Sequence, residues 1–283
     1  MAFHTPTLKL LSSSVLIAIS GVFRLRIASL FLGISPGIFI YLAVFLIIYA
    51  TYTFDRTLES KEDKINKKEL ISSRKDIALA LCLISLATGC LILSLENLLL
   101  IALLPVIIGY IYGKGLRIGQ RVLKLKGNFG MKNLTVSITW GIFLSGIVQH
   151  WADSSYIVPL FILPFITVKS FINTVIWDFR DVKGDAAAGI KTLPIYLGEK
   201  KASRLLQVMH VVLHLWMAAG IYMNLINTEW TIIFTLALAG MINTILYTKP
   251  STGNESRSWK TTRNILMHGE FILAVVLREV THF

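Results

Sequence analysis

The sequence has few charged residues. Asp, Glu, Lys and Arg make up only 16% of its 283 residues, whereas 54% are hydrophobic and the mean hydropathy is +0.67. A soluble globular domain has about 25% charged and about 45–50% apolar residues. The composition therefore excludes an ordinary soluble domain and predicts a membrane protein.

Cysteine and histidine are also scarce. Cys82 and Cys90 fall in one apolar stretch, which argues against a disulfide framework. His210 and His214 stand four residues apart, but the other four histidines are scattered, so we expect this pair to serve helix packing rather than a metal site. The first nine residues lack the basic region and cleavage site of a signal peptide.

Long apolar runs account for most of the chain. A helix needs about 20 mostly apolar residues to cross a bilayer. Nine such runs predict an all-α integral membrane protein, one domain over residues 1–283, with nine transmembrane helices around a central cavity. The predicted spans are 8–31, 36–54, 76–95, 97–113, 133–150, 156–177, 203–223, 229–247 and 264–281.

The basic residues orient this bundle. Of the 28 lysines and arginines, 24 are Lys9 or lie in the segments 56–75, 114–132, 178–204 and 248–263. The loops on the other side carry none, which is the positive-inside pattern. The net charge of +12 is thus a topology signal and not a sign of nucleic-acid binding. We expect the cavity to open toward the cytoplasm, in a prokaryotic inner membrane.

Acidic residues gather at the predicted cytoplasmic ends of spans two and six. In the first group, Asp55, Glu59 and Asp63 would share one face if the helix continues. In the second, Asp178 and Asp181 share a face, and we expect Gly184 to let the backbone turn so that Asp185 folds back.

Two carboxylate groups at the mouth of an apolar bundle suit Mg²⁺, which takes one or two carboxylates together with substrate phosphates. The interleaved Arg56, Arg180 and Lys183 add donors for phosphate oxygens. The alternative is that both groups are solvated loops beside the membrane. The two groups together, each after a span and on the same face, favour a metal and diphosphate site.

Three sequence patterns are specific to one family. They are Asp178-x-x-Asp181-x-x-Gly184-Asp185 with the segment 189–198, Tyr110-Ile-Tyr-Gly-Lys114, and the segment 126–133. Through these patterns the chain resembles the UbiA superfamily of intramembrane prenyltransferases over nearly its whole length. The first acidic group departs from the family pattern NDxxDxxxD, because Thr51 and Tyr52 replace its Asn and first Asp. Asn173 is either a compensating amide or an interhelical hydrogen-bonding residue.

The resemblance implies nine helices and Mg²⁺-dependent transfer of a prenyl group from an isoprenoid diphosphate to an aromatic or other lipophilic acceptor. It implies metal binding by the acidic residues, diphosphate binding by basic residues and Asn173, and a catalytic set that includes Tyr110, which would orient a lysine or shield the allylic cation. The metal set is Asp55, Glu59, Asp63, Asp178, Asp181 and Asp185; the diphosphate set is Arg56, Lys114, Arg180, Lys183 and Asn173; the catalytic set is Lys114, Tyr110, Asp55 and Asp181.

Other functions stay open on the sequence alone. A UbiA-like terpene cyclase would trap the cation with its own double bonds, and the altered first motif is compatible with that outcome. Inverted repeats in the two halves of the chain would favour a transporter, but none is evident in the sequence. A non-catalytic membrane scaffold would not require two acidic groups. Arg24, Arg26 and Lys169 lie in or near spans and are expected to face the interior of the bundle.

Overall fold

The computed structural model describes residues 6–58, 73–118, 121–123, 130–152, 156–187, 189–248 and 257–281. Its helices are α1 (Pro6–Leu32), α2 (Ile38–Thr57), α4 (Lys75–Leu95), α5 (Leu99–Lys114), α6 (Met131–Gln149), the π-helix η2 (Val158–Ile162), α7 (Leu163–Ala187), α8 (Leu193–Leu197), α9 (Glu199–Tyr222), α10 (Trp230–Tyr247) and α11 (Arg257–Thr281).

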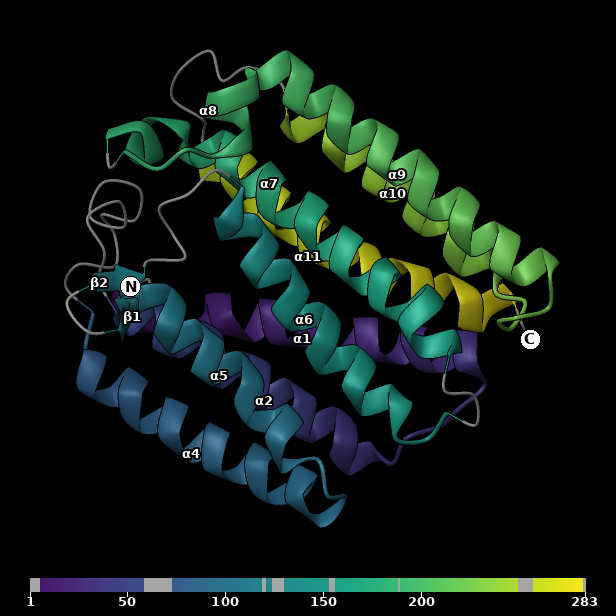
Figure 1. Ribbon diagram of the computed structural model, residues 1–283, viewed down its shortest axis with the longest axis horizontal. Helices are drawn as coiled ribbons and strands as arrows, with labels where there is room; N and C mark the ends of the chain where they lie inside the picture. The colour runs from purple at the N-terminus through teal and green to yellow at the C-terminus, as the bar shows by residue number, and fades with distance from the viewer. Residues whose placement is uncertain are drawn as a thin grey trace.

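Helices dominate because a backbone in lipid must satisfy its own hydrogen bonds. Successive long helices run back and forth, so that α1 begins at the left of Figure 1 and α11 ends at its right. Neighbours in sequence pack together, as α1 does with α2, α6 with α7 and α10 with α11, and α11 returns to pack on α1. The C-terminal part of α7 lies at the same end of the bundle as α8.

Each predicted span overlaps a helix of the structure, but not every helix is a clear span. Within the described residues, seven helical segments are long and apolar enough to cross a membrane. The apolar stretch of α5, Leu99–Tyr112, is shorter, and α11 carries several charged residues. The chain is therefore an integral multi-pass membrane protein, while the count of nine spans stays a prediction.

One short hairpin departs from the predicted all-helical chain. Strands β1 (Leu116–Ile118) and β2 (Arg121–Leu123) pair antiparallel, with Leu116 opposite Leu123. They lie in the segment 114–132, where the sequence predicted only a basic loop. The hairpin follows α5 directly, after Gly115 ends that helix with a positive φ of 82°.

The distribution of side chains matches a protein surrounded by lipid. Large apolar side chains such as Leu100 and Phe234 lie on the outside, exposed by 83% and 66%. Polar and charged side chains, among them Lys169, Asp178 and Glu270, are buried between helices. A buried charge needs an opposite charge or a hydrogen-bond partner. The ion pairs between the helices are therefore the first places to look for a functional site.

Candidate functional site

The second acidic segment lies within the last turns of α7. The helix is continuous through Gly184 to Ala187, so the predicted turn at Gly184 is wrong. Asp185 needs no turn to reach Asp178, because residues seven apart in a helix share a face. Both side chains are almost fully buried, with exposures of 2% for Asp178 and 1% for Asp185.

Lys132, in the first turn of α6, joins the two carboxylates. Its Nζ lies 2.8 Å from Oδ1 of Asp178 and 3.0 Å from Oδ2 of Asp185. The neighbouring Asn133 donates its amide hydrogen to the other oxygen of Asp178, over 2.8 Å. Helix α6 packs along α7, which brings these two residues to the acidic segment. The result is a buried cluster of two carboxylates, an ammonium group and an amide.

Asp181 has a different partner. The guanidinium of the adjacent Arg180 donates two hydrogen bonds to its carboxylate, both of 2.7 Å. The same guanidinium lies over the ring of Trp177 at 4.9 Å. Lys132 therefore joins Asp178 to Asp185, while Asp181 and Arg180 form a more exposed pair beside them.

The first acidic segment begins at the end of α2. This helix ends at Thr57 and Leu58 leaves the helical conformation, so the helix does not continue unbroken to Asp63. Glu59 and Asp63 lie outside the described residues. Asp55 is partly buried, and Arg56 donates a hydrogen bond to the hydroxyl of Ser14 on α1.

The two residues that break the family pattern are engaged in packing. Thr51 donates its hydroxyl hydrogen to the carbonyl of Ile47 in the same helix, over 2.8 Å. The ring of Tyr52 stacks on Trp140 of α6 with centroids 5.4 Å apart, and its hydroxyl accepts a hydrogen bond of 3.1 Å from the Trp140 indole. On the described part of this segment, Asp55 is thus the one carboxylate.

Two further predicted residues lie on α5. Tyr110 is 53% exposed, and Lys114 is the last residue of the helix. The side chains of Lys114 and of Lys183, on α7, are outside the described part of the structure. Lys114 ends α5, and Lys183 lies in the last turns of α7. That these two lysines contact the acidic residues stays a prediction.

Asn173 belongs to a second buried polar network, between α7 and α11. Its amide donates a 3.1 Å hydrogen bond to Oε1 of Glu270, and Nζ of Lys169 lies 3.1 Å from Oε2 of the same carboxylate. Arg24 of α1 donates to the hydroxyl of Ser170 over 2.8 Å. Asn173 therefore makes an interhelical hydrogen bond, which was one of its two predicted roles.

Three residues of these two networks were not predicted from the sequence: Lys132, Asn133 and Glu270. Lys132 and Asn133 stand at the start of a span in the segment 126–133, so a signal was present. Glu270 is an intramembrane carboxylate in the predicted span 264–281, which by itself marks a paired residue. By contrast, Arg26 pairs with Glu279, 3.4 Å away, and so forms part of neither cluster.

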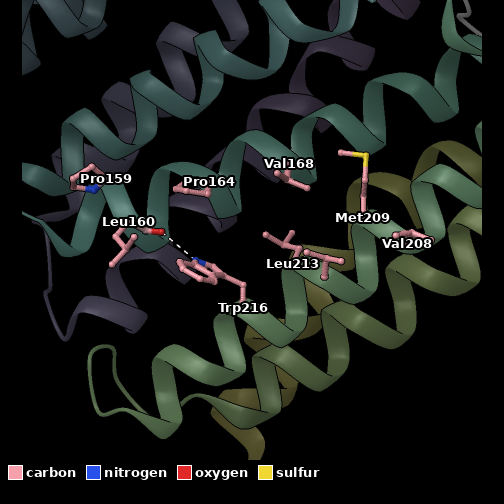
Figure 2. Close-up of a pocket in the computed structure, with 9 residues that line it drawn as sticks. Pro159, Leu160, Pro164, Val168, Val208, Met209, Leu213 and Trp216 are labelled. Carbon is pink, nitrogen blue, oxygen red and sulfur yellow. Dashed lines mark hydrogen bonds between the residues drawn. The ribbon is translucent and has the colours of Figure 1, made fainter.

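A pocket of about 500 Å³ lies elsewhere, between η2, α7 and α9. Figure 2 shows its apolar side chains and the hydrogen bond of 3.1 Å that the Trp216 indole donates to the carbonyl oxygen of Leu160. Val168, at its edge, precedes Asp178 by ten residues, about 15 Å along the helix at 1.5 Å per residue. Within the described part of the chain, the residues that line this pocket are uncharged and offer no cation to hold a diphosphate.

The described residues near Asp178 offer oxygen atoms for a hard cation, but too few to bind one without a further ligand. Among the residues that the structure describes, no three His, Cys, Asp or Glu side chains form a group that could hold a metal ion by themselves. However, Asp178 and Asp185 converge on a single positive charge, and within the same described residues the side-chain oxygen of Asn133 is buried without a hydrogen-bond partner. Such an oxygen-rich set fits Mg²⁺ when substrate phosphates supply further ligands.

Curated proteins with related sequences are digeranylgeranylglyceryl phosphate synthases. The digeranylgeranylglyceryl phosphate synthase of Sulfurisphaera tokodaii is 30% identical over 183 residues, 61% of each chain, and that of Methanobrevibacter smithii is 25% identical over 245 residues, 80% of each. The chain matches only part of the length of some relatives: 61% of the Sulfurisphaera tokodaii enzyme and 32% of the Methanopyrus kandleri enzyme of the same name.

Solved structures share the fold. A UbiA homologue from Aeropyrum pernix superposes with a TM-score of 0.64 at 15% identity, over 91% of this chain and 98% of the other. A UbiA homologue from Archaeoglobus fulgidus, bound to GPP and Mg²⁺, has a TM-score of 0.63 at 15% identity, over 97% and 99%. The model of the UbiA prenyltransferase family matches residues 11–268, and the chain therefore belongs to the UbiA prenyltransferase family.

Proposed function

We propose that the protein is a Mg²⁺-dependent prenyltransferase that moves a prenyl group from an isoprenoid diphosphate to a lipophilic acceptor within the membrane. The observation that supports this most is that the buried carboxylates of Asp178 and Asp185 meet at one positive charge, in a chain of the UbiA prenyltransferase family. The Archaeoglobus homologue of the same fold is bound to DMAPP or GPP with Mg²⁺.

The proposed metal-holding residues come from both acidic segments. When bound, the metal would neutralise the charge that develops on the departing pyrophosphate. We propose that Asp55, Glu59, Asp178, Asp181 and Asp185 take this role through their match to the family pattern, and that Asp63 extends the first acidic group. The site would then lie at the end of the bundle where α7 ends. We propose that this end faces the cytoplasm of a prokaryotic cell and that residues 1–283 form one domain.

Basic side chains would hold the diphosphate. Arg56, Arg180 and Lys183 supply donors for its oxygens, because guanidinium and ammonium groups form strong charge-assisted hydrogen bonds with phosphate. Lys114 would stabilise the pyrophosphate as the C–O bond breaks, and Tyr110 would orient Lys114 or shield the allylic cation. We assign Asn173 instead to holding α7 against α11, because its amide donates to Glu270.

The apolar interior would keep water from the allylic carbon, so that the acceptor and not water takes the prenyl group. The relatives are named for making digeranylgeranylglyceryl phosphate. A glycerol phosphate that carries one geranylgeranyl group is therefore the first acceptor to test, followed by aromatic acceptors.

The test is pyrophosphate release by the purified protein from geranylgeranyl diphosphate, with and without Mg²⁺. We expect release that requires both Mg²⁺ and an acceptor, with a prenylated acceptor as product. Release without an acceptor, with a cyclic hydrocarbon or alcohol formed, would show a terpene cyclase instead. No release from prenyl diphosphates of any length, with a folded protein, would reject the proposal.

A further inference from the structure

The cluster around Asp178 contains its own cation. The Lys132 ammonium group lies within hydrogen-bond distance of both Asp178 and Asp185, and the two carboxylates are almost completely buried. Two carboxylates and one ammonium group leave this cluster with one net negative charge, where the carboxylates alone would carry two. A divalent ion is attracted less strongly by the smaller charge.

The oxygens of Asp178 are both used by α6. Oδ1 accepts from Lys132 and Oδ2 accepts from Asn133, each over 2.8 Å. A metal ion that bridged the same two carboxylates would compete with the ammonium group for their oxygens. The Lys132 ammonium group thus lies between Asp178 and Asp185, where such a bridging ion would also lie.

The first acidic segment also has fewer groups that could bind a metal ion than the family pattern has. Tyr52 stands where the family pattern has a carboxylate, and its ring and hydroxyl are held by Trp140, on the same helix α6 as Lys132. Thr51, in place of the amide, bonds to its own helix. Helix α6 therefore contacts both segments, and on each side a feature of the sequence lowers the capacity for metal.

We propose that Lys132 is a built-in cation of the diphosphate site, which replaces one divalent ion between Asp178 and Asp185. The proposal rests on the diphosphate site proposed above and concerns how its charge is supplied. A fixed ammonium group has three donors, so it can hold both carboxylates and leave one hydrogen for a phosphate oxygen. Lys132 is then a positioning residue for the carboxylates and an electrostatic partner of the diphosphate.

The experiment counts bound ions directly. Mn²⁺, which accepts the same oxygen ligands as Mg²⁺, is titrated into the purified protein in detergent, alone and with inorganic pyrophosphate, and free Mn²⁺ is followed by its paramagnetic resonance signal. Lys132→Met is compared with the wild type. Lys132→Arg keeps the charge, and Lys201→Met removes a charge from an exposed position of α9.

We expect Lys132→Met to bind one more Mn²⁺ per protein than the wild type, while Lys132→Arg and Lys201→Met match the wild-type count. Equal counts for Lys132→Met and the wild type would overturn the proposal, because the ammonium group would then move aside for the ion. The titration with Mn²⁺ alone gives this answer even if no prenyl diphosphate proves to be a substrate.

A second measurement covers the case in which Lys132→Met does not fold. Wild-type crystals grown with Mn²⁺ and pyrophosphate would show by anomalous scattering where the ions lie. An ion bonded to both Asp178 and Asp185 overturns the proposal. Lys132 bonded to both carboxylates, with every ion elsewhere, supports it.

Discussion

Lys169 and Glu270 meet inside the helix bundle, with Nζ 3.1 Å from Oε2 and side-chain exposures of 0% and 1%. The pair joins α7 to α11, and Asn173 donates to the second oxygen of the carboxylate. Lys169 lies in the same helix as Asp178, so the pair fixes that helix against the C-terminal helix α11. The pair is thus part of the framework behind the candidate site.

Lys169→Met should destabilise the protein strongly, because it leaves the buried Glu270 without its cation. Breaking a buried ion pair in this way costs about 3–5 kcal/mol. The measure is the thermal unfolding temperature in detergent. The double variant Lys169→Met, Glu270→Gln should recover much of the loss, and Lys201→Met serves as the control for a lysine outside the bundle. If the single and double variants unfold at the same temperature, the charge pairing is not what holds these helices.

Asp178→Asn should nearly abolish turnover while the protein stays folded. The change keeps the size of the side chain but removes the charge that meets Lys132. Even outer partners of a metal site cost about 10- to 100-fold when mutated, so we expect a loss of about 100-fold or more in Mg²⁺-dependent pyrophosphate release. Asp76→Asn removes an exposed carboxylate of α4 and should have little effect. A near-normal rate for Asp178→Asn would remove the second acidic segment from the site.

Gly141→Val should separate α6 from α7. A side chain at Gly141 would collide with the hydroxyl of Thr167 and approach Leu163 on α7. Small residues let helices approach closely in membranes, and overpacking costs about 1–3 kcal/mol. We expect a lower unfolding temperature together with slower turnover, since Lys132 and Asn133 move with α6. Gly269→Ala, at a helical glycine with open space, is the matched control.

Thr51→Asn should be tolerated or should raise activity if Thr51 occupies the amide position of the family pattern. Thr51 faces Gly109 of α5, since its methyl group lies 3.7 Å from where a Cβ on that glycine would stand. Turnover and the unfolding temperature are measured beside those of Thr51→Val, which has the same shape without the hydroxyl. A misfolded Thr51→Asn protein would mean that the alignment of the first motif is wrong.

Lys114→Ala should weaken pyrophosphate binding and slow ionisation of the prenyl diphosphate. The expected loss in turnover is about 100-fold, the size seen when one donor to a developing negative charge is removed. Binding is measured by calorimetry with pyrophosphate and Mg²⁺, and turnover by pyrophosphate release. Unchanged affinity and rate would exclude Lys114 from the site, and Lys201→Met again controls for the loss of a lysine charge.

Much of the fold could be predicted from the sequence, because lipid makes hydropathy a direct guide to helices. Every predicted span overlaps a helix, and the family was identified from the motif around Asp178. The predicted turn at Gly184 was wrong: glycine permits a turn but does not require one, and the helix there is continuous. The β1–β2 hairpin was missed because its strands are only three residues long and lie in a segment that was interpreted as a basic loop.

The sequence by itself determined the class of protein and where its long helices lie, because these depend on composition and on apolar runs along the chain. It also marked the acidic residues that we propose for the site. Only the tertiary structure decided which charges meet. Lys132 and Asp178 are 46 residues apart, and Lys169 and Glu270 are 101 apart. Such pairs form because two helices pack side by side, and the packing depends on many side chains at once, so no local pattern in the sequence reveals them.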